Sequence, residues 1–269
     1  MGVVARLLPG NVTLLGLYRF GSRNYGTCHA ASDWDYFAVV DNVEGDLVLS
    51  SLSQITAPRL NVNVLTPRSF QTRLDAHGID VLEAWAHPVF ELGQSGLKLA
   101  TPCSATVAFP SRACVGLSFR FVYDAARLRH SISALVDLTW CKARKKLVGS
   151  RDAHGSRKNM FHAFRIMGCA IELARHHASV DAKGTVKDAA SDEKRAAFTS
   201  PKHRVGIADW TAGAPTYHQI MALEGGATPE FCTLQLWKTW DAAYRPRLRL
   251  LRSHFRRLCP KYPPSSTPL

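Results

Sequence analysis

The sequence predicts a small mixed α/β domain over residues 10–100, an α-helical domain over residues 111–259 and a disordered tail at 260–269. In the first part, two apolar runs rich in β-forming residues, 14–20 and 36–40, are separated by a Gly-Ser pair and two carboxylates. In the second part, apolar residues recur at three- and four-residue spacing over long stretches, which is typical of helices. A chain of 269 residues is long enough to bury two modest cores.

Two carboxylates open the second apolar run. Asp33 and Asp35 are two residues apart, and on a strand such positions share a face, so both should project together while Trp34 points away. Adjacent carboxylates repel one another unless a cation lies between them. Mg²⁺ accepts one or two carboxylates and keeps its other positions for water and substrate phosphates. The pair therefore predicts a divalent metal site, for Mg²⁺ or Mn²⁺.

The Gly-Ser pair between the two runs predicts an anion site. Gly21 allows the backbone to approach a ligand closely, and Ser22 offers a hydroxyl and an N–H at the start of an expected short helix. Either motif alone is also common in ordinary turns and strand ends. Together they would place a phosphate-binding site beside a metal-binding site.

This order of motifs resembles the nucleotidyltransferase domain of the DNA polymerase beta-like superfamily. The matching residues are Gly21-Ser22, Ser32-Asp33 and Asp35, and the longer match from Phe20 to Tyr36 resembles its bacterial and viral "predicted nucleotidyltransferase" branch. The resemblance implies Mg²⁺-dependent transfer of a nucleoside monophosphate from a nucleoside triphosphate, such as ATP, to an RNA end, a protein or a small molecule. It casts Asp33 and Asp35 as catalytic metal ligands. Ser22, the backbone at Gly21, and Arg23 as a supporting cation would hold the β and γ phosphates.

One departure from the family lies on the expected strand 59–65. The resemblance places a further catalytic acid on this strand, where the present sequence has Asn61 and Asn63. An asparagine can offer an amide oxygen to a metal but adds no charge and accepts no proton. Glu83, on an expected helix over residues 79–86, is an alternative source of the acid or an ordinary helical glutamate. The enzyme is therefore expected to be attenuated, and the alternative is a degenerate protein that binds nucleotide or RNA without turnover.

A second candidate group lies on an expected helix over residues 158–173. Lys158, His162 and Arg165 are at positions i, i+4 and i+7, which share one helical face. The row resembles the Lys-x-x-x-His-x-x-Arg helix that follows the nucleotidyltransferase domain in this branch. The resemblance implies that these residues bind substrate phosphates across a cleft from the metal. The alternative is a solvated basic face with a half-buried histidine.

The charge of the chain is unevenly distributed. Residues 1–100 hold 7 Lys and Arg against 9 Asp and Glu, whereas residues 101–269 hold 27 against 12. Such asymmetry suits a polyanionic partner, RNA or a triphosphate. Six arginines with no nearby acid crowd the second half of the last expected helix and indicate an RNA-facing surface, although helix C-termini attract basic residues in any case: Arg245, Arg247, Arg249, Arg252, Arg256 and Arg257. A third interpretation is thus an RNA-binding adaptor.

Cysteine usage and hydropathy indicate the compartment. The seven cysteines are scattered and form no Cys-x-x-Cys pair, which favours reduced thiols over a zinc site. No apolar run is long enough to cross a bilayer, and the first residues lack a secretory pattern. We expect a cytoplasmic protein with no membrane partner.

The remaining expectations concern element boundaries. Thr66 should cap a helix with Pro67 at its first position. The others are a linker at 93–110, a helix at 119–146, loops at 149–155 and 180–200, a helix at 217–223, and a last helix at 229–258 that contains Pro246.

Overall fold

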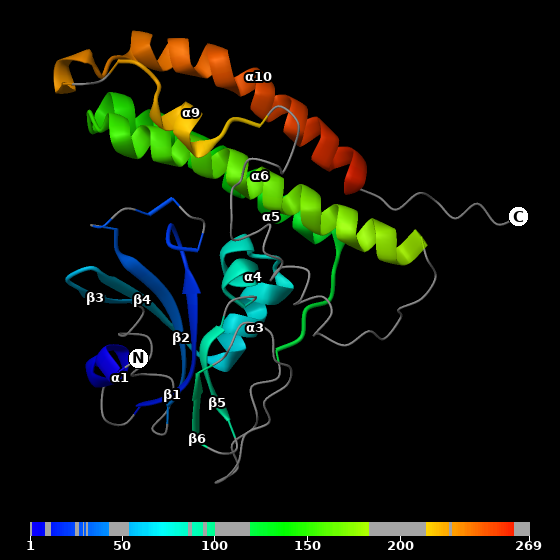
Figure 1. The fold of residues 1–269 in the computed structure, drawn as a ribbon. Coiled ribbons are helices and arrows are strands. Elements are labelled where there is room, and N and C mark those ends of the chain that lie inside the picture. The colour runs from blue at the N-terminus through cyan, green and yellow to red at the C-terminus, as the bar shows by residue number, and fades with distance from the viewer. Residues whose placement is uncertain are drawn as a thin grey trace, which may run out of the picture. The chain divides into compact units, whose positions relative to one another are not determined.

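A computed structural model describes residues 2–8, 12–24, 27–28, 30, 32–42, 54–85, 88–93, 96–99, 119–182, 214–225 and 228–260. These residues belong to two compact units, and the first gives way to the second between Val122 and Tyr123. The sequence placed the linker earlier, at 93–110. Figure 1 labels the elements of both units, which are described one at a time below.

The first unit is an α+β fold built on one mixed six-stranded sheet, in the order β3-β4-β2-β1-β5-β6. Strands β2 and β4 are parallel, and the other neighbouring strands are antiparallel. The strands are β1 (Val12–Phe20), β2 (Trp34–Asn42), β3 (Gln54–Ala57), β4 (Leu60–Leu65), β5 (Pro88–Gly93) and β6 (Gly96–Leu99). The mixed α+β class is thus confirmed. The linker prediction is wrong at its start, because β5 ends at Gly93 and β6 follows within the predicted linker.

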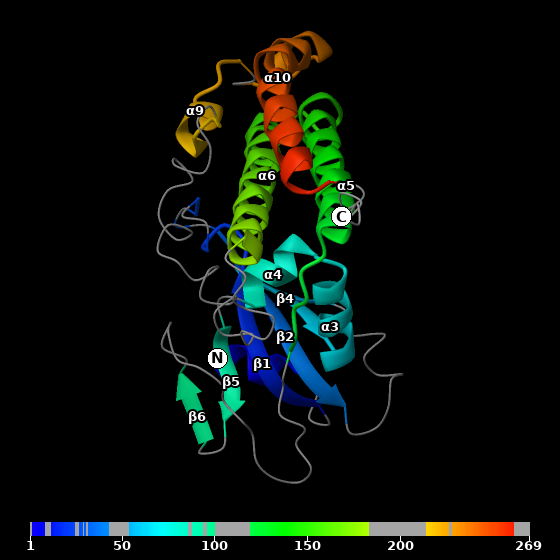
Figure 2. The same ribbon diagram turned by 90° about the vertical axis from the view of Figure 1, so that its right-hand side faces the viewer.

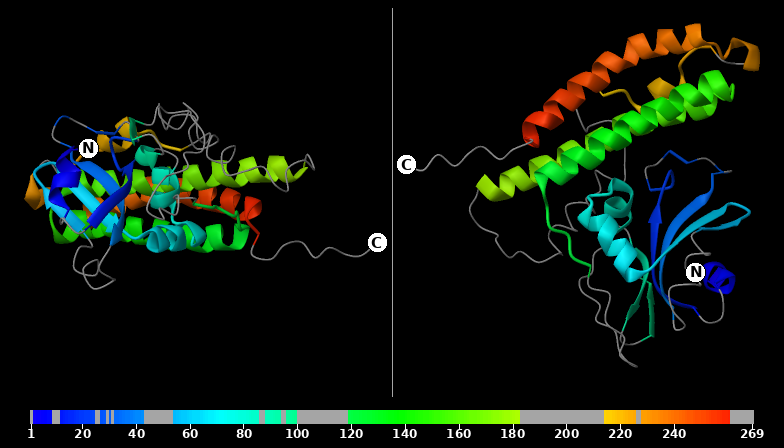
Figure 3. Two further views of the ribbon diagram at one scale, coloured as in Figure 1. Left: turned by 90° about the horizontal axis from the view of Figure 1, so that it is seen from below. Right: turned by 180° about the vertical axis from the view of Figure 1, so that it is seen from behind.

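Helices cover both faces of this sheet (Figure 3). On one face, helix α1 (Gly2–Leu7) packs Val4 with Leu17 of β1 and Val40 of β2 in a single apolar cluster. The other face carries Tyr18 and Phe37, whose rings lie 4.9 and 6.4 Å from that of Phe70. Since β2 is buried on both sides, its sequence reads as a continuous apolar run rather than an alternating one.

The helices on the Phe70 side begin where the sequence predicted. In α3 (Pro67–Asp75), the Thr66 hydroxyl accepts a hydrogen bond from the Ser69 N–H at 3.0 Å, and Pro67 occupies the first position. Helix α4 spans Ile79–Trp85. The cap at Thr66 and the starts of both helices therefore follow from local sequence.

The second unit is α-helical (Figure 2). It contains α5 (Ala125–Arg144), the π-helical turn η1 (Lys145–Gly149), α6 (Ala153–Ala182), α9 (Tyr217–Met221), the 3₁₀ turn η3 (Pro229–Phe231) and α10 (Leu234–Leu258). Aromatic side chains join three of these helices, because the Trp140 ring of α5 lies 6.1 Å from Phe164 of α6 and 5.8 Å from Trp237 of α10.

Several predicted bounds in this unit are wrong, for reasons of capping. The loop predicted at 149–155 shrinks to residues 150–152, because the Asp152 carboxylate accepts the Gly155 N–H at 2.7 Å and α6 starts there. Helix α6 also runs to Ala182, into the loop predicted at 180–200. The last helix starts at Leu234, since the Thr233 hydroxyl caps it, and it continues through Pro246.

Some predictions lie outside the described residues: the rest of the loop at 183–200, most of the linker, and the tail at 261–269. Among the helices that the structure describes, none has an apolar stretch long enough to cross a membrane.

Candidate functional site

The carboxylate pair lies at the start of β2. Asp33 immediately precedes the strand and Asp35 is its second residue. Because β2 and β4 are parallel and in register, Asn61 lies level with Asp35. The Asn61 amide donates from Nδ2 to Asp35 Oδ1 at 3.2 Å and, more weakly, to Asp33 Oδ2 at 3.5 Å. The three side chains therefore converge on one face of the sheet.

Asn61 performs a specific electrostatic role here. The positive edge of its amide group faces two carboxylates and offsets their repulsion without adding a formal charge. The same amide, turned over about its last torsion, would present Oδ1 instead, which is an acceptable ligand for a hard cation. Asn63 pairs with Phe37, two residues further along the strand. Of the two asparagines that replace the expected acid, Asn61 is the one beside the pair.

Gly21 lies directly against Asp35. Its φ of +82° is in the left-handed region, and a Cβ placed on it would lie 2.2 Å from Asp35 Oδ2. A side chain is therefore excluded both by the backbone conformation and by the carboxylate. The Gly-Ser turn and the carboxylates thus lie side by side, whereas the predicted approach of Gly21 to a ligand stays a prediction.

Ser22 is buried within a turn, so the short helix expected to start there is not formed over residues 21–24. The Asn24 N–H donates to the Gly21 carbonyl at 3.0 Å, and the Thr27 N–H donates to the Ser22 carbonyl at 3.1 Å. Arg19 and Asn24 add a reciprocal pair of 2.5 Å hydrogen bonds across the turn. The sequence did not predict these two hydrogen bonds, because a single Arg and a single Asn five residues apart form no distinctive pattern.

Arg23 holds the segment that leads into β2. Its guanidinium donates to the Ser32 carbonyl at 2.6 Å and to the Asp33 carbonyl at 3.2 Å, and it lies 4.1 Å from the centre of the Trp34 ring. Trp34 thus points away from the carboxylates, as predicted. Arg23 positions the backbone on which Asp33 and Asp35 are carried. Its expected contact with phosphates stays a prediction.

Glu83, the alternative acid, is buried on α4. Its charge is one reason that the pKa of Asp80 is raised, although burial of Asp80 is the larger cause. The residue that lies beside Asp33 and Asp35 is Asn61. Within the described part of the chain there is no group of three or more His, Cys, Asp or Glu residues that could hold a metal. The pair fits a cation that takes two carboxylates and draws its remaining ligands from a substrate.

Lys158, His162 and Arg165 share one face of α6, in the second unit. Arg165 is buried and donates from Nε to His162 Nδ1 at 3.4 Å, so the imidazole carries its proton on Nε2. Burial, and then the charges of Arg165 and Lys158, lower the pKa of His162 to about 3. At neutral pH the row therefore has two cations and a neutral imidazole. Its contact with a nucleotide stays a prediction.

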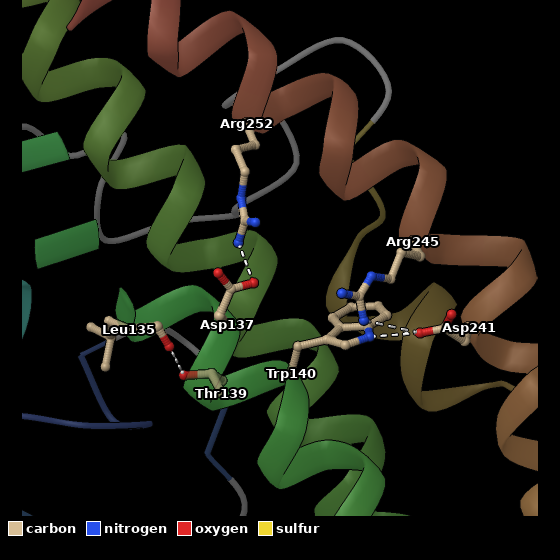
Figure 4. A network of polar contacts seen from close by, with 7 residues as sticks. All are labelled: Leu135, Asp137, Thr139, Trp140, Asp241, Arg245 and Arg252. Atoms are coloured by element: carbon tan, nitrogen blue, oxygen red, sulfur yellow. Dashed lines mark hydrogen bonds and ion pairs between the residues drawn. The ribbon is translucent and has the colours of Figure 1, made fainter. Parts of the chain in front are cut away.

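The sequence-based statement that the six arginines of α10 have no nearby acid is wrong for two of them (Figure 4). Arg252 pairs with Asp137 of α5 at 2.7 Å, and Arg245 lies 3.5 Å from Asp241. Asp241 also accepts the Trp140 indole N–H at 2.7 Å. The sequence did not predict the pairing of Arg252 with Asp137, because the two residues are 115 positions apart.

The five cysteines in the described residues, Cys28, Cys141, Cys169, Cys232 and Cys259, are free thiols. Comparison with known proteins adds no further constraint. No family model, no curated protein and no solved structure matches this chain. Function is therefore inferred from the geometry of the two candidate groups.

Proposed function

We propose that this protein is a slow nucleotidyltransferase, which transfers a nucleoside monophosphate from a nucleoside triphosphate to an acceptor with the help of Mg²⁺ or Mn²⁺. The observation that supports this proposal is the contact between the Gly21-Ser22 turn and the carboxylate pair. The turn proposed to bind phosphate lies against Asp35, and Asn61 on the neighbouring strand joins Asp35 to Asp33, the two carboxylates proposed to hold the metal.

Each residue has a role in this proposal. Asp33 and Asp35 hold the cation, whose chemistry is to neutralise charge that develops on the α-phosphate. The backbone at Gly21 and the Ser22 hydroxyl bind the β and γ phosphates from a turn rather than from a helix N-terminus. Arg23 orients the strand entry through its two carbonyl contacts. Transfer of this kind needs positioning and electrostatic stabilisation rather than a covalent bond to the protein.

Asn61 explains why the proposed enzyme is slow. It lies where the family resemblance places an acid, and an amide can neither add charge to the metal site nor accept the acceptor's proton. General-base assistance contributes about 10²- to 10⁴-fold to a rate. A site with two carboxylates and an amide therefore retains binding but loses much of this acceleration.

The test is a screen of labelled nucleoside triphosphates with RNA ends, proteins and small molecules as acceptors, with and without Mg²⁺ or Mn²⁺. We expect metal-dependent label transfer to one acceptor class, with loss in Asp35→Asn. Asp75→Asn, which changes an exposed carboxylate of α3, is the matched control and should retain activity. Transfer that persists in EDTA or in Asp35→Asn would refute the proposal.

The second candidate is a protein that binds the metal–nucleotide complex without turnover. The hydrogen bonds from Asn61 to both carboxylates favour it, because they stabilise the pair without any cation. Calorimetric titration with Mg²⁺ and a nucleoside triphosphate separates the two. Binding that depends on Asp35, together with no transfer to any acceptor, would establish this second function.

A further inference from the structure

A regular row of basic side chains runs along α10. The row consists of Lys238, Arg245, Arg249, Arg252 and Arg256. Their spacings of seven, four, three and four residues keep all five on one flank of a helix with 3.6 residues per turn. From Lys238 to Arg256 the row advances 18 residue positions, or about 27 Å along the helix axis at 1.5 Å per residue.

The row is fixed in place at two of its five positions. Arg252 and Arg245 bond to Asp137 and Asp241, so these arginines tie α10 to α5 and to itself (Figure 4). Only 18% of the Arg252 side chain is exposed, which marks it as part of the packing. Lys238, Arg249 and Arg256 are exposed, and none has a carboxylate within ion-pair distance in the part of the chain that the structure describes.

Helix packing determines the orientation of the row. Trp237, Trp240, Leu248, Leu251 and Phe255 are buried, and together they form the inner face of α10. The basic row lies along the edge of this buried face, so packing of the helical core determines which way the row faces. The preference of helix C-termini for cations accounts for Arg256 and Arg257 in the last turn, but not for cations several turns earlier. Seven basic residues and a single acid, Asp241, occur on this helix.

We propose that the α10 row is a docking surface for the phosphate backbone of a nucleic-acid duplex. Exposed cations that have no carboxylate partner among the described residues, held on a helix, complement a line of phosphates, and a duplex presents one negative charge per roughly 1.7 Å of its axis. Trp140, whose ring lies 5.9 Å from Arg245, and Trp237, next to Lys238 in the sequence, are buried and offer no face on which an unpaired base could stack. Recognition is therefore electrostatic, independent of base sequence, and stronger for duplexes than for single strands.

The surface needs neither a nucleotide nor a metal, so it stands apart from the proposed transferase activity. The test measures binding of the full chain to a 20-base-pair DNA duplex, an RNA duplex and one of their single strands, in EDTA and without nucleoside triphosphate. Affinity is followed from 50 to 300 mM salt. The variant Arg249→Gln/Arg256→Gln removes two exposed cations of the row and retains helix-forming side chains.

The matched control is Arg247→Gln/Arg257→Gln, which removes the same charge from the same helix. Arg247 lies 5.4 Å from the Tyr244 ring and Arg257 lies 3.4 Å from His254, and both point away from the row. We expect the row variant to reduce the slope of log affinity against log salt by about 1.8, since each phosphate contact contributes about 0.9. Its affinity should fall roughly 10- to 60-fold at 0.1 M salt, and the control should change less than about threefold.

The proposal is supported if both duplexes bind alike and more tightly than the single strand, with the loss confined to the row variant. Equal losses in the two variants would mean attraction to overall charge, and would overturn the assignment to this row. Tighter binding of the single strand would overturn the choice of duplex. An absence of duplex binding at 50 mM salt would overturn the proposal as a whole.

Discussion

The carboxylate site of the first unit and the basic row of the second unit both bring like charges together, yet they offset the repulsion differently. At Asp33 and Asp35 the partner is a neutral amide, which leaves both negative charges in place. On α10, Arg245 and Arg252 are paired with carboxylates, and three cations of the row remain. The amide keeps the first site ready for a cation, whereas the ion pairs fix the second surface and leave its outer charges available.

The largest expected effect comes from removing one of the paired carboxylates. Asp33→Asn or Asp35→Asn should lower metal-dependent transfer at least 100-fold, because one carboxylate and two amides hold a divalent cation poorly. The melting temperature should stay the same or rise slightly, since the repulsion is relieved. Steady-state rates and thermal melts check both expectations. If either variant keeps near-wild-type turnover, Asp33 and Asp35 do not hold a catalytic cation, and the proposed contrast with the basic row on α10 fails.

A side chain at Gly21 should disturb the same site through the backbone. Gly21→Ala combines an unfavourable left-handed φ with contact against Asp35 Oδ2, and we expect a loss of about 2 kcal/mol of stability. Gly149→Ala is the control, because a Cβ there meets no atom within 4 Å. Urea denaturation of both variants measures the difference. If Gly21→Ala is as stable as the control, the turn does not need its glycine.

Restoring the acid on β4 sharpens the contrast between amide and carboxylate. Asn61→Asp should raise transfer roughly tenfold, a modest share of the 10²–10⁴ that general-base assistance supplies. Asn63→Asp, two residues further from the pair, should leave the rate nearly unchanged. Measurement of turnover for both variants under saturating Mg²⁺ decides the matter. A gain at residue 63 and none at residue 61 would contradict the assigned role of Asn61.

The smallest expected effect concerns His162, which should make the free energy of unfolding of the second unit fall as the pH is lowered. Its pKa of about 3 in the folded state lies below the unfolded value near 6.5, so the unfolded chain binds an extra proton as pH falls from 6.5 toward 3. This contribution to stability is fully present above pH 6.5 and is lost in that window, at up to about 1.4 kcal/mol per pH unit. His162→Gln should lose this part of the pH dependence between pH 7 and 5.5.

The control for that measurement is His154→Gln, which removes an exposed imidazole from the first turn of α6. Urea midpoints of both variants and the wild type, measured at each pH, provide the comparison. The control should follow the wild-type profile. A His162→Gln profile parallel to that of the wild type would show that the half-buried His162 imidazole is not the group that responds.

Local sequence patterns predicted much of the first unit. The strands around Asp35, the cap at Thr66, and the opposite directions of Trp34 and the carboxylates all follow from neighbouring residues. The hydrogen bonds of Asn61 depend on the parallel register of β2 with β4, which no local pattern encodes. The internal role of Arg23 likewise required knowledge of which carbonyls come within its reach.

In the second unit, helix type was predictable and long-range pairing was not. Apolar spacing identified the helices, but their ends depended on caps such as Asp152 and Thr233. The pairing of Arg252 with Asp137 crosses 115 residues and changes the interpretation of the arginines from a uniform basic surface to a row with fixed and exposed members. Nucleotidyltransfer itself stays a prediction, since it depends on chemistry that the fold alone does not test.

The same long-range pairing has a consequence for the growing chain. Helix α10 begins about 90 residues after α5 ends, and at roughly 5–20 residues per second a ribosome needs about 5–18 seconds to make that stretch. During this interval Trp140 and Phe164 have neither Trp237 nor Tyr244 to pack against. These aromatic side chains of α5 and α6 therefore lack their α10 partners until that helix has been made.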